Sequence, residues 1–180
     1  MREPRRARAG SGEAVATAGG NNPAALPVGD GEPRAESVGG PPDGDTPEDL
    51  GRADATTDRR HRGTVNVAVG TTRSLAPGAL PNLVAVAAEA KAATLLARVG
   101  VPGTASDAIV VGCDPTGEVA AFSGSATPVG AAARVCVRDA VSAALSARYA
   151  EESPPTSVDA ADYGVVSDAR ARVEKVGSPE

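Results

Sequence analysis

The alternation of apolar and polar positions predicts the strands of this chain. Residues 64–70 read TVNVAVG, and their three valines fall on one side with the period of two that is typical of a half-buried strand. Residues 13–19, EAVATAG, and 108–113, AIVVGC, are short apolar runs between turn residues, which indicate buried strands. Weaker signals mark a strand in 119–122, VAAF, and another around 164–168 near the C-terminus.

Two longer apolar stretches predict helices. The first extends to about Arg98, with Pro81 in its first turn and Gly100 as its stop. The second begins after Thr127, a good N-cap before Pro128, and extends to about residue 149. Both helices are rich in Ala, so they can approach a neighbouring layer closely.

The alternation of strands and helices after residue 63 favours an α/β fold, in which helices pack on a mixed β-sheet in a single domain with a long disordered loop. Residues 29–62 are rich in Gly, Pro, Asp and Arg and nearly free of aliphatic residues, so we expect them to form that loop. His61 at its end is then a solvated linker residue. The expected organisation is a flexible basic N-terminus (1–12), a first strand and turn (13–28), the disordered loop (29–62), an α/β core (63–150) and a C-terminal tail with an edge strand (151–180).

The composition of the chain excludes some classes of function. The net charge of −5 argues against a binder of nucleic acid or of anionic membranes, which carry basic patches. The N-terminal arginines have no apolar segment behind them, and no uncharged stretch is long enough to span a bilayer, so we expect a cytoplasmic protein. Formation of a homo-oligomer stays open.

Metal and redox chemistry have little support. Cys113 and Cys136 lie in apolar stretches without CxxC spacing and are expected to be small buried residues. A single histidine cannot assemble a typical zinc site, and no metal or other cofactor is expected, although a hard cation could still be held by Asp and Glu.

Lys91 stands out because it lies at the centre of an almost wholly apolar helix, LVAVAAEAKAATLLAR, and the chain has only one other lysine. At about 100° per residue it shares a sector with apolar residues that include Ala87 and Leu95, whereas Glu89 points elsewhere and cannot pair with it. Two interpretations follow. Lys91 extends its ammonium group from the edge of the helix into water, or it points into a cleft and meets a carboxylate, an anion or a carbonyl group.

Ser106 and Asp107 are the candidate partners of Lys91, because they lie at the entry to the next predicted strand, in a loop that Gly103 allows to bend tightly. A hydroxyl group beside a lysine can act as a nucleophile with its base. The spacing alone does not establish the pair.

Five motifs in a fixed order resemble the adenosylcobinamide amidohydrolases, salvage enzymes of cobalamin metabolism. These are TAG and Asn-Pro within residues 17–23, GTVN at 63–66, EAK at 89–91, PGTASDAIVVGC at 102–113 and SGSATPVG at 123–130. The resemblance extends from about residue 13 to 149. The family's N-terminal segment, which precedes the TAG motif, is expected to be missing here.

The resemblance implies hydrolysis of the amide that joins the corrin propionate to 1-amino-2-propanol, giving adenosylcobyric acid. The residues that match the motifs are then catalytic (Lys91, Asp107, Ser106 and Glu89) or substrate-binding (Asn22, Asn66 and Thr104). Lys91 would act as a base or as a partner of the oxyanion, and Asp107 would orient Lys91 or activate water. A metal-assisted route through Glu89 and Asp107 also stays open. A non-catalytic corrinoid-binding module, or an inactive truncated remnant, is the alternative function.

Overall fold

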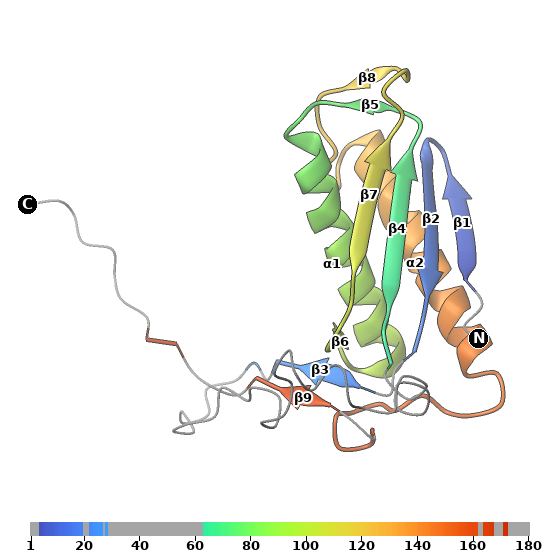
Figure 1. Cartoon of the computed structure of the whole chain (residues 1–180), viewed down its shortest axis with the longest axis vertical. Helices are drawn as coiled ribbons and strands as arrows, with labels where there is room; N and C mark the ends of the chain where they lie inside the picture. The colour runs from blue at the N-terminus through green and yellow to red at the C-terminus, as the bar shows by residue number, and fades with distance from the viewer. Residues whose placement is uncertain are drawn as a thin grey trace, which may run out of the picture.

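The predicted strand with alternating valines is the third strand of a four-stranded mixed sheet (Figure 1). The computed structural model describes residues 4–19, 22–26, 28, 63–161, 164–167 and 171–172. In the main sheet β1 pairs with β2, and β2 with β4, in antiparallel fashion, whereas β4 and β7 are parallel. Its strands, in spatial order, are β1 (Arg5–Ala9), β2 (Gly12–Thr17), β4 (Asn66–Thr71) and β7 (Ile109–Cys113).

The expectation that residues 1–12 form a flexible basic N-terminus is wrong for Arg5–Ala9, which form the strand β1. The segment RRARA alternates, with Ala7 and Ala9 packed against the core and two arginines on the outer face. Arg6 and Arg8 both form ion pairs with Glu13 on β2, at N–O distances of 3.0 and 2.6 Å. This arginine-rich segment therefore forms an ordered edge strand, because the alanines that alternate with the arginines pack against the core.

Two helices of 21 residues each cover the same face of this sheet (Figure 1). Helix α1 (Ala79–Val99) ends at Gly100, which has a left-handed φ of 76° and donates its N–H to the carbonyl oxygen of Leu96. Helix α2 (Pro128–Arg148) begins at Thr127, whose Oγ1 accepts the N–H of Gly130 at 3.1 Å. Both predicted caps are confirmed.

Helix α1 is long and apolar enough to cross a membrane by length and composition alone, with a mean hydropathy of 1.3 over its most apolar 18 residues. Its packing is that of a core helix, because residues such as Leu83 and Leu95 are buried in the same cluster as the sheet. The apolar composition of α1 is therefore explained by its contacts with the sheet and with α2.

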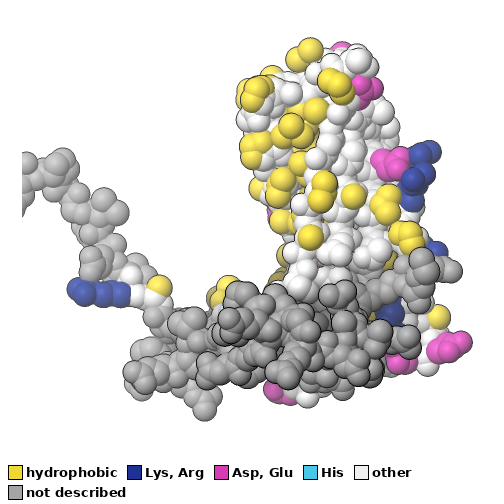
Figure 2. Space-filling model, in the orientation of Figure 1, with side chains coloured by type: hydrophobic (Ala, Val, Ile, Leu, Met, Phe, Trp, Pro, Cys, Tyr) yellow, Lys and Arg dark blue, Asp and Glu magenta, His cyan; other side chains and the backbone are white. Residues whose placement is uncertain are grey.

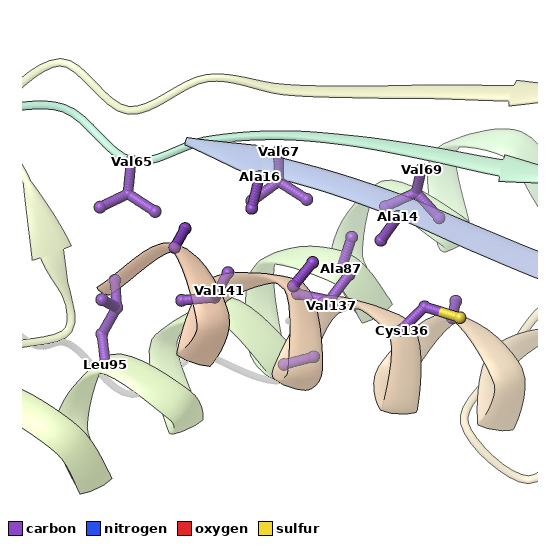
Figure 3. Close-up of a cluster of buried hydrophobic side chains, with 14 of the residues drawn as sticks. Ala14, Ala16, Val65, Val67, Val69, Ala87, Leu95, Cys136, Val137 and Val141 are labelled. Carbon is purple, nitrogen blue, oxygen red and sulfur yellow. The ribbon is translucent and has the colours of Figure 1, made fainter. Parts of the chain in front are cut away.

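The core lies between the sheet and the helices and is built from Ala, Val, Leu and one Cys (Figure 3). Val65, Val67 and Val69 point from the central strand toward the helices, as their alternation predicts. The layers approach closely: a Cβ added at Gly12 would lie 3.1 Å from the Cβ of Ala132 on α2. A core with few aromatic residues is therefore filled by short side chains on closely spaced elements.

Two small sheets cover the ends of the main sheet (Figure 1). At the end where β4 and β7 begin, β3 (Pro23–Ala25) pairs with β6 (Gly103–Thr104) and β9 (Val165–Val166). At the opposite end, β5 (Ser74–Leu75) pairs with β8 (Val119–Ala120). The α/β fold, the strand in 119–122 and the C-terminal strand are confirmed, whereas β3, β5 and β6 are not apparent in the sequence pattern. The predicted loop over 29–62, with His61, lies outside the described residues.

Candidate functional site

Lys91 is buried, and its ammonium group faces a carboxylate. The residue is 8% exposed, and its Nζ donates a hydrogen bond to Oδ2 of Asp107 at 2.6 Å. Each of the two side chains is 10% exposed. The predicted pairing is confirmed, and the alternative in which Lys91 extends into water is wrong, because the helix face that carries it packs against β6 and β7 rather than solvent.

Asp107 is the acceptor of four hydrogen bonds. Besides Lys91, it receives the backbone N–H of Val65 at 2.8 Å, the backbone N–H of Thr104 at 2.9 Å and the hydroxyl group of Thr104. These donors come from the start of β4, from β6 and from α1. One carboxylate thus joins three elements and fixes the position of the Lys91 Nζ, and with its lone pairs engaged it has little capacity to activate water.

Gly103 makes room for this pair. A Cβ at position 103 would lie 2.8 Å from Oδ2 of Asp107 and 3.9 Å from Nζ of Lys91. The first distance is shorter than any ordinary contact, so a side chain there would displace the carboxylate. The glycine in the PGTASD motif is therefore required by the space that the ion pair occupies.

Asn22 lies beside the same loop and has an unsatisfied polar atom. Its backbone carbonyl accepts the N–H of Ala105 at 3.1 Å, and the next residue, Pro23, is the register partner of Thr104. Asn22 is 7% exposed, and no donor among the described residues reaches its Oδ1. A buried amide oxygen without a partner costs free energy, so it is suited to accept a hydrogen bond from a ligand.

Ser106 and Asn66 form a polar cluster with Thr64 at the beginning of β4 and β7. Thr64 Oγ1 donates to the carbonyl oxygen of Ser106 at 2.8 Å, and Ser106 Oγ lies 3.3 Å from Thr64 Oγ1. Asn66 Oδ1 accepts the N–H of Ala108 at 3.1 Å. The Ser106 hydroxyl group is not paired with Lys91 in the structure; it is hydrogen-bonded to Thr64 instead. Thr64 is not among the predicted site residues, although it belongs to the GTVN motif from which Asn66 was selected.

Glu89 lies in a different contact. Its Oε1 accepts a hydrogen bond from Nη1 of Arg134 on α2 at 2.5 Å, and its side chain is 60% exposed. It joins the two helices on a face of α1 that the Lys91–Asp107 pair does not share. Among the described residues no group of three or more His, Cys, Asp or Glu side chains lies close enough to hold a metal ion.

The resolved shifts in pKa lie outside this site. Burial raises the pKa of the Cys136 thiol in the core. Hydrogen bonds from Thr116 lower the pKa of Asp114, and a hydrogen bond from Arg138 lowers the pKa of Asp139. Cys113 and Cys136 are both free thiols. Cys136 is fully buried as expected, whereas Cys113, which was also expected to be buried, is only partly buried because it lies at the end of the edge strand β7.

Chemically, the site offers a fixed ammonium group, an unsatisfied amide oxygen and several hydroxyl groups. Only one acceptor, Asp107, engages Lys91 within the described part of the chain, so further N–H donors of its Nζ are available to a ligand. Such a donor suits a carbonyl oxygen on which negative charge develops.

Comparison with known proteins identifies relatives of this chain. A family model described as adenosylcobinamide amidohydrolase matches residues 3–153. A curated protein named adenosylcobinamide amidohydrolase, from Halobacterium salinarum, is 53% identical over 167 residues, which cover 93% of this chain. The chain spans 63% of the length of that relative. No solved structure matches.

Proposed function

Because this chain belongs to the adenosylcobinamide amidohydrolase family, we propose that it hydrolyses the amide bond between the corrin propionate and 1-amino-2-propanol in adenosylcobinamide. Water is consumed, the C–N bond breaks, and the products are adenosylcobyric acid and the amino alcohol. Adenosylcobyric acid can then re-enter cobalamin synthesis. The observation that carries the proposal is the buried Lys91–Asp107 pair, which is assembled from the family-like EAK and PGTASD motifs.

An amide carbonyl is a poor electrophile, so its hydrolysis needs a donor for the oxyanion and a proton for the leaving amine. Lys91 is suited to both roles, because its ammonium group is held rigidly and retains unused donors. In the tetrahedral intermediate it would donate a hydrogen bond to the oxyanion, and on collapse it would supply the proton that the departing nitrogen takes up. The proton released by the attacking water would then restore its ammonium form. Asp107 is a positioning residue in this scheme, since its four hydrogen bonds hold Lys91 in place.

Asn22 would orient the scissile amide. Its unsatisfied Oδ1 is an acceptor for the substrate N–H, while its own amino group can donate to a neighbouring carbonyl group. A secondary amide offers the complementary donor and acceptor. Burial of Asn22 next to the Thr104–Asp107 loop supports this role.

Two hydroxyl groups are candidates for the attacking nucleophile, besides water itself. Thr104 Oγ1 donates to Asp107, so its proton already has an acceptor, and the exposed Ser106 hydroxyl is held by Thr64. A covalent route through either one would leave an acyl-enzyme that carries the corrinoid. Mass spectrometry of the intact protein after rapid quenching would detect that adduct, and Thr104→Val and Ser106→Ala would identify its position.

The reaction is tested by incubating the protein with adenosylcobinamide in ¹⁸O-labelled water and analysing the products by mass spectrometry. Hydrolysis predicts adenosylcobyric acid that carries the label in its new carboxyl group, together with free 1-amino-2-propanol. Binding of the corrinoid without either product would instead identify a non-catalytic corrinoid-binding module and would contradict the proposal.

A further inference from the structure

The chain that follows α2 returns to the candidate site and places a strand beside it. The structure describes residues 156–161 and 164–167 of this stretch, and we call them the C-terminal segment. They lie beyond residue 153, where the family match ends. Their strand β9 pairs with β3 in parallel fashion, so β3 is the central strand of the small sheet, between β6 and β9 (Figure 1).

The first part of the C-terminal segment rests on helix α1. A Cβ added at Gly100, just after the helix, would lie 2.9 Å from the carbonyl oxygen of Thr156, so the two backbones are in close contact. A turn follows, in which the carbonyl oxygen of Val158 accepts the N–H of Ala161 at 3.2 Å. Because one part of the segment lies against α1 and the other pairs with β3, the segment holds β3 against the body of the domain.

Glycine at position 164 allows this close approach. A Cβ added there would overlap Cγ1 of Val158 and would lie 3.2 Å from the carbonyl oxygen of Pro23. Valine is branched at Cβ and has few rotamers, so its methyl group cannot easily move aside. Gly164 therefore lies where the turn and β3 meet, and no larger residue fits without displacing one of them.

The strand β3 connects the C-terminal segment to a site residue. On one side of β3, the carbonyl oxygen of Ala25 accepts the N–H of Ser167 at 3.0 Å. On the other side, the carbonyl oxygen of Asn22 accepts the N–H of Ala105 at 3.1 Å. The residue between, Pro23, has no N–H to donate, and so short a pair of strands is marginal in water without a third. Pairing with β9 therefore supports the position of Asn22.

The contact between the C-terminal segment and β3 depends on fit rather than on charge. The three residues of β3 are uncharged. The oppositely charged side chains that lie together at the β1 edge of the main sheet belong to another region, where Arg6 and Arg8 pair with Glu13 (Figure 2). A change in side-chain size is therefore the appropriate test of the contact.

We propose that the C-terminal segment positions Asn22 in the candidate site, and that this depends on the absence of a side chain at Gly164. The proposal rests on the proposed function, in which Oδ1 of Asn22 orients the scissile amide, and adds to it the element that holds this side chain in place. Lys91 and Asp107 are held by hydrogen bonds that do not involve β3, so a shift of β3 displaces Asn22 and leaves that pair intact.

Three variants test the contact. Gly164→Ala adds the Cβ for which Val158 leaves no room, and should move β9 away from β3. Adding Val158→Ala removes the overlapping Cγ1 and leaves the new Cβ 3.4 Å from the Cβ at position 158, an ordinary contact, so the double variant should recover most of what was lost. Gly78→Ala is the control, because a Cβ there meets nothing within 4 Å.

Amide hydrogen exchange measured by NMR reports on β3 independently of activity, because the Ala105 N–H has Asn22 as its acceptor. In Gly164→Ala this amide should exchange at least ~10-fold faster, while amides of β2 and β4 keep their protection. The double variant and Gly78→Ala should exchange like the wild type. Unchanged exchange at Ala105 in Gly164→Ala would overturn the proposal.

Kinetics with adenosylcobinamide show whether the effect passes through Asn22. In Gly164→Ala we expect kcat to fall roughly 10- to 100-fold with a smaller change in KM, because a misplaced orienting group slows the reaction more than it weakens binding. Val158→Ala should restore kcat. In an Asn22→Ala background, Gly164→Ala should cost little more, since both changes remove the same contribution.

The remaining outcomes separate this proposal from the reaction itself. A lower Tm of Gly164→Ala with wild-type kcat would show that the segment only stabilises the fold, and would overturn the proposal. A full additional loss of kcat in the Asn22→Ala background would overturn it too. If the wild type does not hydrolyse adenosylcobinamide while exchange at Ala105 changes as expected, the reaction is rejected and the positioning of Asn22 is retained.

Discussion

Nζ of Lys91 on α1 lies 2.6 Å from Oδ2 of Asp107, at the point where β4, β6 and β7 meet. The lysine has Asp107 as its acceptor, whereas the aspartate has three further hydrogen bonds, from Val65 and Thr104. The two partners are therefore unequal: the carboxylate is held by the protein, and the ammonium group is held by the carboxylate.

This inequality predicts different costs for the two conservative replacements. Asp107→Asn should lower the free energy of unfolding by about 3 kcal/mol, because it leaves a buried ammonium group without a charged partner. The new amide also turns an N–H toward donors of Val65 or Thr104. Lys91→Met should cost only about 1–2 kcal/mol, since Asp107 keeps three donors. Urea denaturation of both variants measures the difference, and equal losses would contradict the geometry.

Gly103→Ala should disturb the pair without removing either partner. The added Cβ would lie 2.8 Å from Asp107 Oδ2, so the carboxylate must move, at a cost of about 1–3 kcal/mol in stability. The kcat for hydrolysis should fall more than KM rises, because the position of Lys91 rather than corrin binding is changed. Gly78→Ala is the control, since its Cβ meets nothing within 4 Å. Kinetics of Gly103→Ala that match the control would refute this role.

Glu89 should be dispensable for the reaction. Its carboxylate pairs with Arg134 and is largely exposed, so Glu89→Gln should lower stability by no more than about 1 kcal/mol and leave kcat unchanged. Arg134→Gln should have the same small effect, and the double variant should show little additional loss. A large fall in kcat for Glu89→Gln alone would return Glu89 to the catalytic group.

The two cysteines should differ in reactivity. Burial raises the pKa of the Cys136 thiol, so a smaller fraction is thiolate at any pH, whereas Cys113 is partly exposed. In the folded protein iodoacetamide should modify Cys136 at least ~10-fold more slowly than Cys113. Stability should decrease as the pH rises past the ordinary thiol pKa, because the unfolded chain ionises there first. Rapid labelling of folded Cys113→Ser would contradict this prediction.

The sequence predicted those features that depend on local pattern. The valines of β4 and the caps at Gly100 and Thr127 follow from periodicity and from the capping residues. The helical wheel placed Lys91 in the apolar sector of its helix, but its burial became certain only in the structure. The N-terminal strand β1 was missed because its arginines resemble a solvated tail, and only pairing with Glu13 and packing of Ala7 give them an ordered position.

The remaining features of the site depend on distances between elements. Glu89 binds Arg134, which lies 45 residues away on another helix, and no pattern in α1 specifies that partner. The N–H of Val65 reaches Asp107 only because β4 and β7 pair in parallel with a particular register. Asn22 was selected from a motif, but its burial and its unsatisfied Oδ1 are apparent only in the folded structure.

The central claim is that Lys91 stabilises the oxyanion of the scissile amide, and its most direct test is the rate of adenosylcobyric acid formation by Lys91→Met beside the wild type. With melting curves showing that the variant is folded, we predict that kcat falls by roughly 100- to 1,000-fold, the loss typical of removing one oxyanion donor. Wild-type turnover by folded Lys91→Met would contradict the account.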